Sequence, residues 1–131
     1  MAKNQTIKTY EELLNKITYN VEDLGKSSLT RGNTYKITIK YNKKQFTFTF
    51  HDNFYNNSDL NDYIQCLRID SSCYEETKNL NDFITSFYGD IESLEDYKQK
   101  EKAYNACKRA YNALKRLFNS EELELIYNQE Y

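Results

Sequence analysis

The sequence predicts one α+β domain, in which a β-hairpin or a small antiparallel sheet packs against a C-terminal helical bundle with one long helix. Two patterns and the length support this prediction. Apolar and polar residues alternate over residues 35–50, as in half-buried strands. Apolar residues then recur at helical spacing over residues 60–118. The length of 131 residues is usual for a single domain. We therefore divide the domain (1–131) into an N-terminal helix and loop (1–32), a β-hairpin (33–52) and a helical part (58–131).

The N-terminal part begins with a short helix over residues 10–17, whose apolar residues fall on one side. Thr9 precedes this helix and Glu12 follows three residues later, which is the spacing of a capping box. Residues 18–32 contain two of the three glycines and two adjacent serines. We expect a loop there, with at most one helical turn.

The hairpin prediction comes from two alternating runs joined by a short polar link at residues 42–44. The first run places Ile37 and Ile39 on one face, and the second places three phenylalanines on one face. A pairing that sets Ile39 opposite Phe46 or Phe48 brings all the apolar side chains to the same face. Because an isolated hairpin is marginally stable, helices must cover that face.

The helical part begins with a helix from residue 58, capped by Asn57 or Ser58. Asp70 would fall in the apolar stripe if this helix continued unbroken. A carboxylate in that position is costly, so we expect a break, with Asp70 or Ser72 capping a new turn. A short helix from Leu80 to Tyr88 follows and ends at Gly89.

The strongest periodicity predicts one long helix from about Glu92 to Phe118. We expect its apolar seam to cover the hairpin, while pairing with a second copy of the chain would give a homodimer instead of a monomer. Asn119 caps a last short helix through Ile126. The seam consists of Tyr97, Tyr104, Cys107, Tyr111, Leu114 and Phe118.

The net charge of −2 conceals an acidic block followed by a basic one. Residues 58–96 carry ten acidic and two basic side chains, and residues 97–119 carry seven basic and one acidic. The acidic block predicts a surface that attracts a basic partner, although solvated helix faces give the same pattern. The expected partner-binding residues are Asp59, Asp62, Glu75, Glu76, Asp82, Asp90, Glu92, Glu95 and Asp96.

The basic block provides the alternative binding surface, which would take phosphates or a nucleotide. A solvated helix back, or docking against the chain's own acidic segment, explains the same charges. The residues of this face are Lys102, Lys108, Arg109, Lys115 and Arg116.

No catalytic pattern emerges from the sequence. The one histidine, His51, falls on the polar face of a strand, and no phosphate loop, dinucleotide-binding glycine run or nucleophile elbow is found. Asp96 and Lys98 diverge on a helix, and Asp59 with Asp62 offers too few ligands for a cation. The cysteines, which lack metal-binding spacing, are expected to be buried thiols: Cys66, Cys73 and Cys107. We expect no enzyme activity, no metal and no cofactor.

The N-terminal residues lack the apolar stretch of a signal peptide, and no segment is apolar enough to span a bilayer. We therefore expect a cytoplasmic protein with no membrane association.

A weak family pattern runs from about residue 33 to residue 126. In these segments the chain resembles small accessory proteins encoded by phages and mobile elements of low-GC Gram-positive bacteria. The resemblance implies an anti-defence role of the anti-CRISPR type in a bacterial host cell, and it supplies no site residues. The segments are Gln45–Asp52, Leu67, Asp70, Tyr74–Glu75, Asp82–Phe83, Ala106–Lys108, Leu114–Phe118 and Glu121–Glu122.

Together the charge blocks and the resemblance favour an inhibitor that binds a host defence nuclease, such as a CRISPR effector, and blocks its access to nucleic acid. Two alternatives remain open. One is a sponge that sequesters a cyclic-nucleotide immune signal, and the other is a small phage protein that regulates by binding nucleic acid.

Overall fold

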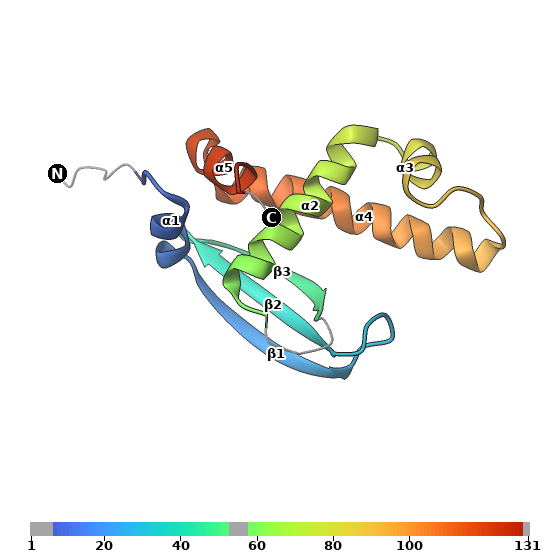
Figure 1. Ribbon diagram of the computed structural model, residues 1–131, viewed down its shortest axis with the longest axis horizontal. Coiled ribbons are helices and arrows are strands. Elements are labelled where there is room, and N and C mark those ends of the chain that lie inside the picture. The colour runs from blue at the N-terminus through green and yellow to red at the C-terminus, as the bar shows by residue number, and fades with distance from the viewer. Residues whose placement is uncertain (1–6, 53–57, 130–131) are drawn as a thin grey trace. The chain divides into compact units, whose positions relative to one another are not determined.

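The computed structural model describes residues 7–52 and 58–129, and these form an α+β fold (Figure 1). The chain divides into two compact units. The sheet unit contains the residues up to Gln65 and those from Leu117 onward, and the helical unit contains Cys66–Arg116. The elements in order are α1 (Tyr10–Lys16), β1 (Thr18–Lys26), β2 (Asn33–Tyr41), β3 (Lys44–His51), α2 (Leu60–Thr77), α3 (Leu80–Phe87), α4 (Leu94–Leu117) and α5 (Ser120–Tyr127).

The three strands of the sheet unit form one antiparallel sheet in the order β1-β2-β3. Ile39 pairs with Phe46, and Ile37 pairs with Phe48, which confirms the predicted hairpin register. Asn42 and Lys43 both have positive φ in the link, at 54° and 68°. Positive φ at both central residues is the geometry that matches the twist of a two-residue hairpin.

The predicted loop over residues 18–32 is wrong in its first half, because β1 pairs there along β2. All nine residues of β1 are exposed, so the strand has no buried face to mark it in the sequence. The pairing shifts by one residue between Asp23 and Gly25, and Gly25 has a φ of 100°. Glycine adopts this backbone conformation without steric cost, which explains a bulge at this point.

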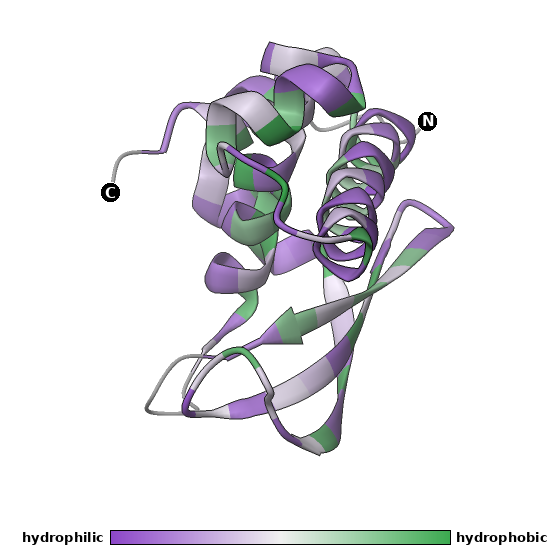
Figure 2. Ribbon diagram, turned by 90° about the vertical axis from the view of Figure 1, so that its right-hand side faces the viewer, coloured by the Kyte–Doolittle hydropathy of each residue, from purple (hydrophilic) through white to green (hydrophobic). Residues whose placement is uncertain are grey.

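One face of the sheet is covered by helical residues of the same unit. Ile37 and Ile39 are fully buried, and apolar residues alternate with polar ones along the strands (Figure 2). Tyr63 of α2 packs edge-on against Phe50, with ring centroids 5.0 Å apart. Such contacts confirm the prediction that helices cover the hairpin's apolar face. The other buried apolar residues of this unit are Leu13, Ile17, Leu60, Ile64, Leu117, Phe118 and Ile126.

Two helices of the sheet unit begin as the sequence predicts. Thr9 and Glu12 form the capping box of α1. Asn119 and Glu122 form that of α5, and the Tyr41 hydroxyl also donates to the Glu122 carboxylate. The side chain and backbone of each pair satisfy N–H groups that a helix start leaves without partners.

The helix α2 differs from its prediction at both its start and its middle. Asp59, and not Ser58, caps the helix, because its carboxylate accepts a hydrogen bond from the Asp62 N–H. Asn57 lies outside the described residues. The expected break is absent, and α2 runs through Asp70 as one helix. Partial burial raises the pKa of Asp70 to about 6, so the carboxyl group holds its proton more readily than an exposed one.

In the helical unit, α4 confirms the predicted long helix and packs its seam against α2 and α3. The Tyr74 ring of α2 contacts Tyr104 and Tyr111, and Phe83 of α3 contacts Tyr104. The last seam residue, Phe118, belongs to the sheet unit. It contacts Tyr41 there. No helix among the described residues is long and apolar enough to cross a membrane.

Candidate functional site

The connection between α3 and α4 in the helical unit combines exposed carboxylates with exposed apolar side chains. We call residues 87–96 the acidic turn. It begins where α3 ends, with the N–H groups of Tyr88 and Gly89 both donating to the Ile84 carbonyl, at 2.9 and 2.8 Å. Gly89 has a φ of 88°, a left-handed conformation that lets the chain leave the helix sharply.

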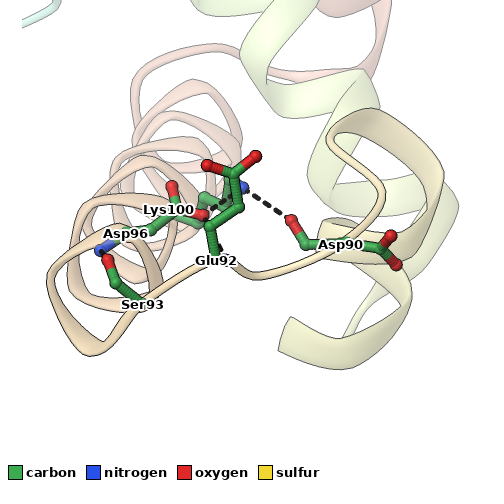
Figure 3. Close-up of polar contacts among 5 residues, drawn as sticks. All are labelled: Asp90, Glu92, Ser93, Asp96 and Lys100. Carbon is green, nitrogen blue, oxygen red and sulfur yellow. Dashed lines mark hydrogen bonds and ion pairs between the residues drawn. The ribbon is translucent and has the colours of Figure 1, made fainter.

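Lys100 of α4 holds this turn in place (Figure 3). Its Nζ donates to the Asp90 carbonyl at 3.1 Å and to Asp96 Oδ2 at 2.8 Å. The same nitrogen lies 5.2 Å from the centre of the Tyr88 ring, within range of a cation–π interaction. One ammonium group therefore joins three positions of the turn.

Asp96 provides the second anchor of the turn. Its Oδ2 accepts from the Glu92 N–H at 3.0 Å, and its own N–H donates to Ser93 Oγ at 3.0 Å. The hydrogen bond from Lys100, followed by that from the Glu92 backbone, lowers the pKa of Asp96. These contacts fix the backbone of the turn, so a partner would meet an already ordered surface.

The acidic turn exposes large apolar side chains that the sequence prediction did not single out. Leu94 is the most exposed of them, at 69% of its surface. Four such residues within eight positions are unusual, because single scattered apolar residues are the normal pattern of a protein surface. They are Phe87, Tyr88, Ile91 and Leu94.

The carboxylates of the turn that do not stabilise the backbone are exposed. Asp90, Glu92 and Glu95 are exposed, and their side chains make no hydrogen bond or ion pair with any residue that the structure describes. Water therefore solvates these three charges, and they are available to a cationic partner. The acidic turn therefore presents exposed carboxylates beside exposed apolar side chains.

The structure distributes the other predicted acidic residues over different places. Asp82 belongs to the cap of α3, where its carboxylate accepts from the Asn79 amide at 2.9 Å. Glu75 and Glu76 are exposed near the end of α2 in the helical unit. The sheet unit contains Asp59 and Asp62, so the predicted acidic residues are divided between the two units.

Asp59 and Asp62 cap the start of α2 reciprocally. The Asp59 N–H donates to Asp62 Oδ2 at 2.9 Å, and the Asp62 N–H donates to Asp59 Oδ1 at 3.1 Å. Burial is the main cause of the raised pKa of Asp62, and the neighbouring Asp59 charge adds to it. This pair stabilises the helix start, which explains its spacing without a bound cation.

The predicted basic residues all lie exposed on α4. Lys115 also places its Nζ 4.9 Å from the centre of the Tyr111 ring. The five residues, Lys102, Lys108, Arg109, Lys115 and Arg116, are presented to solvent by one helix of the helical unit.

His51 makes contacts that the sequence could not indicate. Its Nδ1 lies 2.9 Å from Ser27 Oγ and 3.1 Å from Thr34 Oγ1. Ser27 is buried, and its Oγ already accepts from the N–H groups of Leu29 and Thr30. A nucleophilic serine needs an accessible lone pair, whereas this hydroxyl fixes a turn to a strand.

The three cysteines are free thiols in the helical unit, with Cys107 buried and Cys66 and Cys73 partly buried. Burial raises the pKa of Cys66 and of Cys107 to about 12, and the neighbouring Asp70 charge contributes to both. Such thiols stay protonated at neutral pH and are poor nucleophiles. Within residues 7–52 and 58–129, no group of three or more His, Cys, Asp or Glu side chains could hold a metal ion.

Comparison of the chain with protein families, curated proteins and solved structures finds no match.

Proposed function

We propose that this protein acts by binding, and that its acidic turn docks on a basic surface of a host defence nuclease and blocks access of nucleic acid. The observation that carries the proposal is that exposed carboxylates and exposed apolar side chains lie together on a turn to which Lys100 donates two hydrogen bonds. The resemblance to phage and mobile-element accessory proteins, which implies an anti-defence role, supports the choice of a nuclease as the partner.

The chemistry of the proposed partner follows from the charge of the turn. A nuclease holds its substrate with lysine and arginine side chains that neutralise phosphates. Asp90, Glu92 and Glu95 would take the place of those phosphates, and long-range attraction would accelerate the encounter.

The apolar side chains would supply the rest of the binding free energy. Leu94 and Ile91 keep much of their surface in water, and its burial would contribute about 25 cal/mol per Å². Because the turn is already ordered by Asp96 and Lys100, docking would cost less conformational entropy than the ordering of a flexible loop.

A binding role is also supported by the state of the side chains that would otherwise suggest catalysis. The His51 ring is engaged by two hydroxyl groups, and the Cys66 and Cys107 thiols have pKa values raised to about 12. These groups contribute to the interior of their units.

The test uses a panel of purified RNA-guided nucleases and measures cleavage of labelled target DNA at increasing concentrations of the protein. The wild type is expected to inhibit at least one nuclease at near-stoichiometric concentration. Asp90→Asn/Glu92→Gln/Glu95→Gln should raise the half-inhibitory concentration at least about tenfold, which corresponds to about 1.4 kcal/mol of binding free energy.

The matched control is Glu11→Gln/Glu22→Gln/Glu124→Gln, which removes the same charge from exposed positions outside the turn and should inhibit like the wild type. The proposal fails if the two triple variants inhibit equally. It also fails if the wild type inhibits no nuclease of the panel and its expression does not improve phage plaquing on a CRISPR-immune host.

A further inference from the structure

The outer face of α4 has a pattern of side chains that the proposed function does not use. From Lys102 to Arg116 every charged residue is basic, and all five basic side chains are exposed. The acidic residues of α4 precede this segment. The part of α4 before Lys102 carries charges of both signs, so the uniformly basic part of the helix begins at Lys102.

The helical repeat arranges these residues in three rows. At about 100° per residue, Lys102, Arg109 and Arg116 line one edge of an exposed arc, and Lys108 and Lys115 line the other edge, about 140° away at most. The residues between the two basic rows are amides, Asn105 and Asn112, and both are exposed.

Four of the five basic side chains in these rows have no ion pair with an acid of the described residues. Lys100, two residues before Lys102, is the cation that binds Asp96 and the Asp90 carbonyl. Lys102, Lys108 and Arg109 make no ion pair with a residue of the described parts of the chain. These contacts therefore give no support for docking of the basic face against the chain's own acidic block.

We infer that this face of α4 binds the major groove of duplex DNA, with the two basic rows on the phosphates of the two flanking strands and the amide row toward the base edges. The dimensions agree. A helix with its side chains is about 10–12 Å across, and the B-form major groove is about 12 Å wide. The rows run for about 21 Å along the helix axis, given a rise of about 1.5 Å per residue.

The same arrangement disfavours other nucleic acids. The major groove of duplex RNA is deep and too narrow for side chains to read. A single strand would engage one row of cations and leave the other solvated. Asparagine can pair with the adenine edge through two hydrogen bonds, which gives Asn105 and Asn112 a specific role between the phosphate contacts.

This inference is independent of the acidic turn, and its test leaves all turn residues unchanged. The measurement is the fluorescence anisotropy of a labelled random-sequence 20-base-pair DNA duplex, titrated with the full chain at several salt concentrations. Phosphate contacts by the other four cations, without Arg116, predict a slope of about −3 to −4 for the logarithm of the association constant against that of salt. In Lys108→Gln/Arg109→Gln the slope should become shallower by about 2.

The matched control is Lys36→Gln/Lys40→Gln, which removes two exposed lysines from the sheet and should keep the wild-type slope. Asn105→Ala/Asn112→Ala should keep the slope and reduce the enrichment of particular sequences from the random pool. As a measurement on the unaltered chain, duplex DNA should protect Lys108 and Lys115 from an amine-reactive label.

Three results would overturn the inference. The first is no saturable binding at 50 mM salt. The second is equal affinity for duplex RNA of the same sequence. The third is loss of binding in the sheet control with no loss in the α4 variant, because this would place the nucleic acid on the sheet.

Discussion

The two units use their acidic side chains in different ways. In the sheet unit, Asp52 is 1% exposed and accepts from the Ser58 hydroxyl and N–H, and Glu122 accepts from Tyr41. Glu12 and Asp59 accept from N–H groups at helix starts. In the helical unit, Asp82 and Asp96 also accept hydrogen bonds, but three carboxylates of the acidic turn have no described partner, and Asp70 of α2 is partly buried.

This difference separates acids that stabilise the fold from acids that do not. A carboxylate that satisfies buried or terminal N–H and O–H groups contributes to stability. An exposed carboxylate without a partner contributes little to stability. Three such acids lie on the acidic turn, beside four exposed apolar side chains, and our proposed function assigns them to the contact with a partner.

Asp52→Ala should give the largest effect on stability. It leaves the Ser58 hydroxyl and N–H without their acceptor, which we expect to lower the free energy of unfolding by about 3 kcal/mol. Urea denaturation followed by circular dichroism measures this loss. A variant within about 0.5 kcal/mol of the wild type would show that the buried carboxylate is not structural.

Asp70→Asn tests an acid whose charged form destabilises the fold, because partial burial raises its pKa. The folded pKa of about 6 exceeds the ordinary value of 3.8, so between these pH values the folded chain binds more protons than the unfolded chain. The contribution of Asp70 to stability is therefore fully present at low pH and is lost as the pH rises toward and through 6. The loss is up to about 3 kcal/mol, because one pKa unit corresponds to about 1.36 kcal/mol.

The asparagine variant should thus be more stable than the wild type at pH 8, and the difference should shrink below pH 4. Unfolding titrations at a series of pH values measure it. A difference between the two chains that does not change with pH would contradict the assignment of this titration to Asp70.

Gly89→Ala tests the backbone of the acidic turn. A Cβ at this position would meet no atom within 4 Å, so the φ of 88° is the main source of any cost. We expect a loss of about 1–2 kcal/mol in the free energy of unfolding. Gly25→Ala, at a φ of 100° and likewise with open space, should show a loss of the same order. No loss in either variant would mean that these turns relax to another conformation.

The smallest losses in the free energy of unfolding are expected when an exposed acid is replaced, one in each unit. Asp59→Ala removes a helix cap and should cost about 1 kcal/mol. Glu92→Ala removes a side chain with no described contact, so its cost should stay within about 0.5 kcal/mol. Chemical denaturation measures both losses. If the two variants lose the same free energy of unfolding, the distinction between capping acids and acids without a described contact is wrong.

The sequence predicted the elements that carry a strong local signal. The alternation around Ile37 and Phe48 specified the hairpin and its register, and the Thr9 and Asn119 capping boxes marked two helix starts. The strand β1 was missed because an edge strand exposed on both faces lacks a pattern of burial. The break at Asp70 was wrongly predicted because a carboxyl group with a raised pKa is tolerated within a continuous helix.

The candidate site was predicted only in part. The sequence indicated an acidic region but did not distinguish capping carboxylates from exposed ones. Only the structure shows that Asp59 and Asp62 are caps, and that Lys100 reaches back to fix Asp90 and Asp96. The run of exposed apolar residues among acids could have been a signal, since Ile91 and Leu94 have acidic neighbours in the sequence.

The most direct test of the central claim is the salt dependence of the affinity between this protein and a nuclease of the panel, the class of partner that we propose. If Asp90, Glu92 and Glu95 meet cations of the partner, isothermal titration calorimetry should show an affinity that falls steeply between 50 and 500 mM salt. Neutralising the three carboxylates should flatten that dependence. An affinity that does not respond to salt, or that responds equally with and without the three charges, would contradict the account.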